Sequence, residues 1–117
     1  MKGKRGWGAW GEEYAAKLLT GKGYRIVEKN FRCMLGEIDI VAIDNDTLVF
    51  VEVKTRWSRK FGLPEEAVNE RKLYKIRRVA DFYLLQNKSA LKKQRIDVVA
   101  IQIENNQVNS AKIIKVI

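Results

Sequence analysis

Two β-type segments separated by only two residues constrain the fold of this chain more than any other feature. Residues 37–44 and 47–56 are rich in Val, Ile and Phe, and residue types of this kind favour strands. The intervening Asn45 and Asp46 are residues that favour tight turns. The pattern therefore predicts an antiparallel hairpin.

The register of this hairpin brings two acidic side chains together. With a two-residue loop, Asp44 lies opposite Thr47, and counting back along both segments places Asp39 directly opposite Glu52. A four-residue loop keeps this register, whereas a three-residue loop would move Asp39 to the other face. Directly opposed side chains share a face, with Cβ atoms about 4.5–5.5 Å apart. Because like charges repel at that distance, the pair needs a compensating cation.

Two carboxylates at this spacing can share one divalent cation. The chain has no His and its one Cys is Cys33, which excludes zinc sites built from these residues within the chain and leaves oxygen ligands. This chemistry indicates Mg²⁺ or Mn²⁺, bound by Asp39, Glu52 and the carbonyl group of Val53. Lys54, one pleat beyond Glu52, is placed to orient an attacking water and to stabilise charge on a phosphate.

An ordinary polar sheet face is the alternative interpretation of the same residues, because many ion pairs on sheet surfaces have no further role. Glu37 lies opposite Lys54 in the predicted register, so we expect it to pair with Lys54 rather than to bind a metal. The spacing by itself favours neither interpretation.

The rest of the chain predicts a single α/β domain over residues 1–117, with one central mixed sheet flanked by helices. A chain of 117 residues suffices for one domain with its own core. Apolar periodicity and turn residues divide the segments outside the hairpin into two helices and three strands. The helices are expected at 8–21 and 65–87, and the strands at 24–31, 96–103 and 112–117.

The first predicted helix carries a further candidate acid. Its apolar stripe contains Ala15, Leu18 and Leu19, and helical periodicity places Glu12 on the side of this stripe. The neighbouring Glu13 falls on the exposed side. We therefore expect Glu12 to project toward the sheet and to support the site.

The charge of the chain favours a polyanionic partner. Lys and Arg number 23 against 14 Asp and Glu, a net charge of +9. Trp57 is a candidate for stacking on a base or inserting at a branch point, or else packs back onto the core. The basic stripe of the second helix contacts phosphates or is an ordinary solvated face. The candidate nucleic-acid contacts are Arg56, Trp57, Arg59, Lys60, Arg71, Lys75 and Arg78.

Short motifs along the chain carry a resemblance to a bacterial family. They are Gly8-x-x-Gly11-Glu12-x-x-Ala15, Gly23-Tyr24, Asn30-x-Arg32, Gly36-Glu37-Ile38-Asp39, Val49-Phe50-Val51-Glu52-Val53-Lys54-x-Arg56 and Phe61-Gly62-x-Pro64-x-x-Ala67-Val68. Over most of residues 5–84 the chain resembles the YraN-like family, which is similar to archaeal Holliday junction resolvases and to the PD-(D/E)xK nuclease superfamily.

This resemblance implies a restriction-endonuclease-like domain. It places Asp39, Glu52 and Lys54 on the superfamily's metal-and-lysine motif and Glu12 on the additional helical acid of the resolvases. The chain has Ile38 where the motif has Pro, a change that removes no ligand. The resemblance also makes a homodimer plausible, because resolvases cut symmetrically as two-fold dimers.

Together these features predict a Mg²⁺- or Mn²⁺-dependent endonuclease that hydrolyses phosphodiester bonds in DNA, with branched DNA as one candidate substrate. One alternative is a non-catalytic nucleic-acid-binding module on the same fold, and a second is a basic adaptor for an acidic protein partner. The longest apolar runs are far shorter than the roughly 20 residues of a membrane span, and no apolar signal segment follows the basic residues 1–5. We therefore expect a soluble cytoplasmic protein without a membrane partner.

Overall fold

The predicted hairpin forms the middle of a five-stranded sheet in the computed structural model, which describes residues 4–57, 62–88 and 91–116. The strand order is β1-β2-β3-β4-β5, with β3 and β4 parallel and all other neighbours antiparallel. The α/β class with a central mixed sheet flanked by helices is thereby confirmed. The elements are α1 (Lys4–Gly21), β1 (Arg25–Cys33), β2 (Gly36–Asp44), β3 (Thr47–Arg56), η2 (Pro64–Ala67), α2 (Glu70–Gln86), β4 (Lys93–Glu104) and β5 (Gln107–Lys115).

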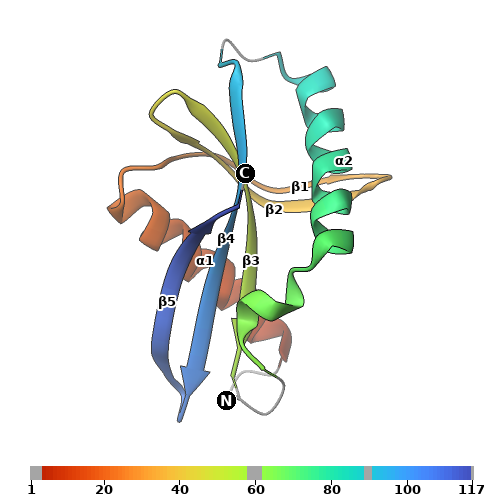
Figure 1. Ribbon diagram of the computed structural model, residues 1–117. Coiled ribbons are helices and arrows are strands. Elements are labelled where there is room, and N and C mark those ends of the chain that lie inside the picture. The colour runs from red at the N-terminus through yellow and green to blue at the C-terminus, as the bar shows by residue number, and fades with distance from the viewer. Residues whose placement is uncertain (1–3, 58–61, 89–90, 117) are drawn as a thin grey trace.

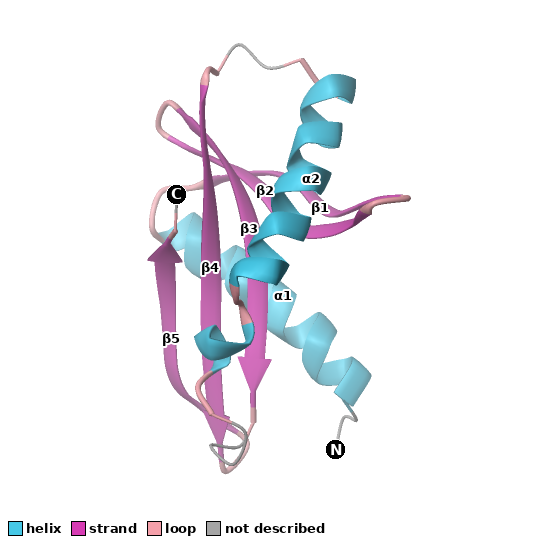
Figure 2. Cartoon of the chain, turned by 45° about the vertical axis from the view of Figure 1, so that its right-hand side comes forward, coloured by secondary structure: helices cyan, strands magenta, loops and turns pink. Residues whose placement is uncertain are grey.

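The two helices cover opposite faces of the sheet (Figures 1 and 2). On the α1 face, Leu19 packs in a buried cluster with side chains of the central strands such as Val49. On the α2 face, Phe50 and Tyr83 belong to a second buried cluster, and their rings meet edge to face. Because both faces are covered, the central strands are nearly continuous runs of apolar residues.

The hairpin between β2 and β3 has the predicted register only over part of its length. Asp44 pairs with Thr47, and the pairing continues in step to Ile40 and Val51. Within the described residues the ladder between these strands ends there, although β3 stays paired with β4 as far as Arg56. The ribbon of β1 and β2 then turns away from β3, as Figures 1 and 2 show.

The regular alternation of β2 side chains between the two faces of the sheet is interrupted at the point where β2 leaves β3. Ile38 packs on the α2 face, whereas Ile40 packs on the α1 face, although strict alternation would put both on one face. On the neighbouring strand, Asn30 lies between the paired residues at this level and has a left-handed backbone, with φ 56°. Asp39 therefore sits at an irregular point of both strands, where the sheet opens.

The second helix begins later than the periodicity predicts. Residues 64–67 form a separate turn of 3₁₀ helix, and the side chain of Asn69 then caps α2 by accepting the N–H of Lys72 at 3.0 Å. Because a capping side chain defines where a helix starts, α2 begins at Glu70 rather than at residue 65.

Other boundaries also differ from the expected ones. The last hairpin is longer than predicted because Asn105 and Asn106 both adopt positive φ and let β4 and β5 pair directly from Glu104 and Gln107. The first helix starts at residue 4 rather than at 8. No described helix is both long and apolar enough to cross a bilayer.

The packing of α1 against β3 depends on the absence of a side chain at Gly11. A methyl group there would collide with Oγ1 of Thr55, so Gly11→Ala should lower the free energy of unfolding by about 1–3 kcal/mol. In the double variant with Thr55→Ala the colliding atom is gone, and most of the loss should be recovered. Urea denaturation of the four proteins of this cycle measures the coupling; a double variant no more stable than Gly11→Ala would contradict this packing.

Candidate metal centre

A hollow of about 230 Å³ opens where β2 leaves β3. It is lined by the four predicted catalytic residues, Glu12, Asp39, Glu52 and Lys54, and by Val53. The two helices contribute from opposite sides, α1 with Glu12 and α2 with Lys72 of its first turn. The structure therefore brings together the four predicted side chains, which the sequence separates by up to 42 positions, from Glu12 to Lys54.

Asp39 and Glu52 form a buried pair of like charges. Their exposed fractions are 9% and 8%, and Asp39 Oδ2 accepts the N–H of Val53 at 2.7 Å in place of a strand-to-strand hydrogen bond. Burial, and next the charge of Glu52, raise the pKa of Asp39 from an ordinary value of 3.8 to about 7, against the opposing effect of the Val53 N–H. Near neutral pH the surrounding protein therefore does not fully stabilise the charged form of both acids.

Lys72 is the cation that the structure places beside Glu52. Its Nζ lies 3.3 Å from Oε2 of Glu52, and the exposed fractions of the two side chains are 43% and 10%. No pattern in the sequence indicates Lys72, because only tertiary packing brings the first turn of α2 to β3.

The expected pairing of Glu37 with Lys54 is wrong. Glu37 instead accepts a hydrogen bond from Nε of Arg32 at 2.9 Å, because Arg32 is its partner on β1 and β2 has already left β3. Lys54 consequently has no ion-pair partner among the described residues and borders the hollow next to the two acids.

Glu12 reaches the hollow from α1, and Glu13 is exposed, as helical periodicity predicts. Burial, followed by the charges of Asp39 and Glu37, raises the pKa of Glu12, while a hydrogen bond from the side chain of Asn30 lowers it. Asn30 is a second residue that the sequence analysis did not single out for a role. Its place in the Asn30-x-Arg32 motif was the available signal.

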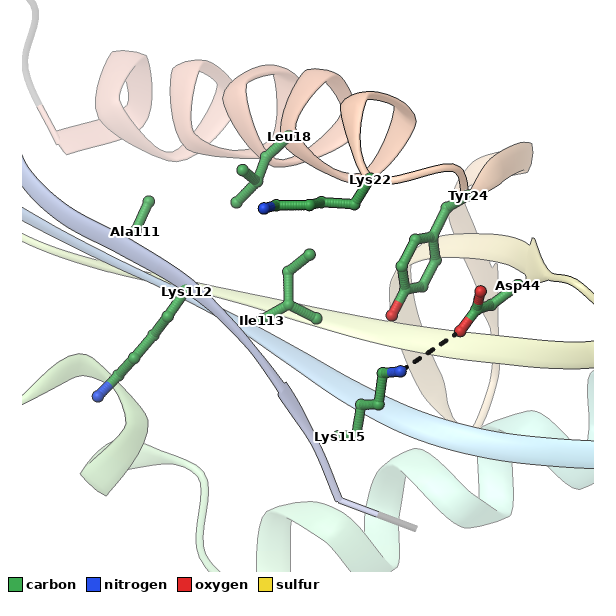
Figure 3. A pocket seen from close by; sticks show the side chains of 8 residues that line it. All are labelled: Leu18, Lys22, Tyr24, Asp44, Ala111, Lys112, Ile113 and Lys115. Carbon is green, nitrogen blue, oxygen red and sulfur yellow. Dashed lines mark ion pairs between the residues drawn. The ribbon is translucent and has the colours of Figure 1, made fainter.

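A larger hollow elsewhere shows how this chain satisfies buried acids that need no ligand. Figure 3 shows Lys115 directed at Asp44, and its Nζ lies 3.8 Å from Oδ2 of this residue. Arg95 donates to Asp44 at 2.7 Å and to the fully buried Asp97 at 2.6 Å, and the hydroxyl of Tyr24 also donates to Asp97 at 2.6 Å. Those carboxylates are neutralised within the protein, in contrast to Asp39 and Glu52.

The donor set of the hollow fits a magnesium-like ion. In the part of the chain that the structure describes, no group of three or more His, Cys, Asp or Glu side chains is arranged to hold a metal. Two carboxylates, Asp39 and Glu52, lie together, and Val53 lines the same space. Mg²⁺ keeps several waters and is commonly held by one or two carboxylates, so this sparse set of oxygen ligands suits it.

The predicted nucleic-acid contacts fall around this hollow to different degrees. Trp57 lines its rim and is 41% exposed, which argues against the alternative that it packs into the core. Arg71, Lys75 and Arg78 are exposed on α2. Arg56 is partly buried, and its Nε has no hydrogen-bond partner among the described residues. The predictions for Arg59 and Lys60 lie outside the described residues.

Most of the chain is similar to proteins of one known family. The model of the family described as "Uncharacterised protein family UPF0102" matches residues 11–101. A UPF0102 protein of Alkaliphilus oremlandii is 54% identical over 98 residues, which cover 82% of this chain and 84% of the relative. A UPF0102 protein of Moorella thermoacetica is 48% identical over 100 residues, 86% of this chain and 83% of the relative. One from Caldicellulosiruptor saccharolyticus is 44% identical over 113 residues, 96% of each.

The burial of Asp39, together with its repulsion by Glu52, predicts an unusual dependence of stability on pH. Because the pKa of Asp39 is raised in the folded state, this state binds the extra proton between about pH 4 and pH 7. The free energy of unfolding contributed by Asp39 therefore falls as the pH rises through this range. Asp39→Asn keeps an acceptor for the Val53 N–H and removes the charge, so in metal-free buffer at pH 8 it should be more stable than wild type by about 2 kcal/mol.

Urea denaturation at pH 5 and pH 8 with a chelator present measures this difference. Asp97→Asn is the matched control, because it removes charge from an acid that is already neutralised and should cost about 3 kcal/mol. An Asp39→Asn variant less stable than wild type at pH 8 would contradict the account of the pair.

Proposed function

We propose that this chain, which belongs to the UPF0102 family, is a Mg²⁺- or Mn²⁺-dependent endonuclease that hydrolyses phosphodiester bonds in DNA. This is the family, called YraN-like above, that the sequence motifs indicate. The observation that carries the proposal is the buried, facing pair Asp39 and Glu52, whose charges the protein itself balances only partly. A buried pair of like charges costs stability, so its presence in a hollow open to ligands favours a bound cation.

The predicted catalytic residues and Val53 each have a role in this proposal. Asp39, Glu52 and the carbonyl group of Val53 would hold the ion, which when bound polarises the phosphodiester and lowers the pKa of a coordinated water. Lys54, which has no ion-pair partner among the described residues, orients the attacking water and stabilises negative charge on the phosphate. Glu12 supports the site from α1.

The reaction adds water across a phosphorus–oxygen bond. The water oxygen bonds to phosphorus and gives up one proton, the bond to the leaving oxygen breaks, and that oxygen takes up one proton to become a hydroxyl group. The side chains of the hollow supply the two features that such a step needs, a cation site for the developing charge and a lysine beside it.

The surroundings of the hollow favour a nucleic acid as the molecule that carries the phosphodiester. The net charge is +9, and Arg71, Lys75 and Arg78 are exposed on the helix whose first turn reaches the hollow. Such side chains bind the phosphate backbone without reading its sequence. Trp57 adds an exposed aromatic ring at the rim, on which a base can stack.

Cleavage assays test the proposed activity. With Mg²⁺ or Mn²⁺, the purified protein should cut at least one of four labelled substrates, namely a four-way junction, a flap, a linear duplex and single-stranded DNA. Asp39→Asn, Glu52→Gln and Lys54→Ala should each lower the rate by at least about 100-fold. The first two remove a carboxylate ligand of the ion, and the third removes the positive charge that stabilises the phosphate. Glu13→Gln, on the exposed side of the same helix as Glu12, is the control and should cut like wild type.

Other outcomes of this assay point elsewhere. Cleavage that persists in all three variants would overturn the assignment of the site. Binding to DNA without cutting, independent of metal and of Asp39, would support the non-catalytic binding module. Weak, easily salted-out DNA binding beside tight binding to one acidic protein would support the adaptor.

The basic face of α2 makes a separate prediction. Lys75→Ala and Arg78→Ala should weaken duplex binding to a similar degree for all sequences and should each reduce the slope of log affinity against log salt by about one. Lys17→Ala, an exposed charge on α1 on the opposite face of the sheet, should leave the slope unchanged. Fluorescence anisotropy over a salt series measures these slopes, and slopes equal to that of wild type would remove α2 from the interface.

A further inference from the structure

We infer that Lys72 is a tethered cation that this site exchanges for the divalent ion: it pairs with Glu52 when the ion is absent and contacts a substrate phosphate once the ion is bound. The inference rests on the proposed function and adds a residue and a step to it. Its starting point is the ion pair between Nζ of Lys72 and Oε2 of Glu52 at 3.3 Å.

The position of Lys72 in α2 shows that its charge does not serve the helix. Asn69 is the N-cap, so Lys72 is the third residue of the first turn, where the helix dipole disfavours positive charge. An acidic residue at this position would reach back to the cap and stabilise the helix. The lysine forgoes that stabilisation, and the contact it makes instead is with a buried acid of the hollow.

The burial of the two partners determines which of them can move. The Glu52 side chain is only 10% exposed, whereas that of Lys72 is 43% exposed. Lysine has a flexible four-carbon stem, so its ammonium group can leave Glu52 without any movement of α2. Glu52, held within β3, stays where it is.

Charge balance gives the direction of the exchange. An ion held by Asp39 and Glu52 carries two positive charges into the space beside the Lys72 ammonium, and the two cations repel each other. A phosphate that enters the hollow brings negative charge on the other side of the ion. The ammonium group is then attracted away from Glu52 and toward the substrate.

The two lysines of the hollow therefore act under different conditions. Lys54 has no ion-pair partner among the described residues and is available for a phosphate with or without the ion. Lys72 becomes available only when the ion takes its place on Glu52. The arrangement makes tight substrate binding depend on prior loading of the metal.

Two binding measurements on Lys72→Met test the exchange. This change keeps most of the aliphatic stem and removes the charge. Without DNA, Mn²⁺ should bind about three- to tenfold more tightly than to wild type, because no tethered cation competes for Glu52. With Ca²⁺ present the variant should bind duplex DNA severalfold more weakly than wild type, and with a chelator present the two should bind DNA equally.

Two further variants serve as controls. Lys72→Arg keeps the charge and should bind Mn²⁺ within about twofold of wild type. Lys75→Met, on the exposed part of the same helix, should leave Mn²⁺ binding unchanged and should weaken DNA binding to the same extent with and without metal.

The results that would overturn the exchange differ from those that would overturn the proposed function. If wild type binds Mn²⁺ but Lys72→Met binds it equally or more weakly, Lys72 does not compete with the ion, and the exchange is wrong. The same holds if Lys72→Met loses DNA affinity equally with and without metal. If wild type and Asp39→Asn both fail to bind Mn²⁺, the metal-dependent function itself is contradicted.

Discussion

The separation of β2 from β3 beyond Ile40 and Val51 is the constraint on which the site depends. Where the ladder ends, the N–H of Val53 bonds to the carboxylate of Asp39 instead of to a strand carbonyl group. The same separation opens the hollow and leaves Asp39 and Glu52 facing each other with little access to water. A regular sheet would have closed this space, and the two helices could not both have reached it.

The central part of this arrangement could be predicted from sequence because it is local. A two-residue loop fixes the register of a hairpin, and this register directs Asp39 toward Glu52, although the ladder itself ends one pair earlier, at Ile40 and Val51. Helical periodicity likewise separates Glu12 from Glu13. What the sequence did not predict depends on contacts between distant elements: the ion pair of Lys72 with Glu52, the hydrogen bond of Asn30 to Glu12, and the partner of Glu37, which follows from the end of the β2–β3 ladder.

The buried acids of this chain have two different kinds of surroundings. This difference distinguishes an acid with a structural role from the acids of the proposed metal site. Asp97 is surrounded by Arg95 and the hydroxyl of Tyr24, so its charge ties β4 to the segment that precedes β1. At the other pair, Glu52 has an ion pair with the partly exposed Lys72, and Asp39 has none among the described residues. The first arrangement is complete without a ligand. The second would gain stability from a bound cation, as the proposed metal-dependent chemistry requires.

The titration of Asp39 is the sharpest test of the proposed metal site. Carbon-13 NMR of the carboxyl groups, assigned through Asp39→Asn, gives its pKa with and without Mg²⁺. The account predicts titration near pH 7 in metal-free buffer and a displacement well below this value with Mg²⁺, because the ion binds only the deprotonated pair. An Asp39 carboxyl group that titrates near pH 4 and does not respond to Mg²⁺ would contradict the account.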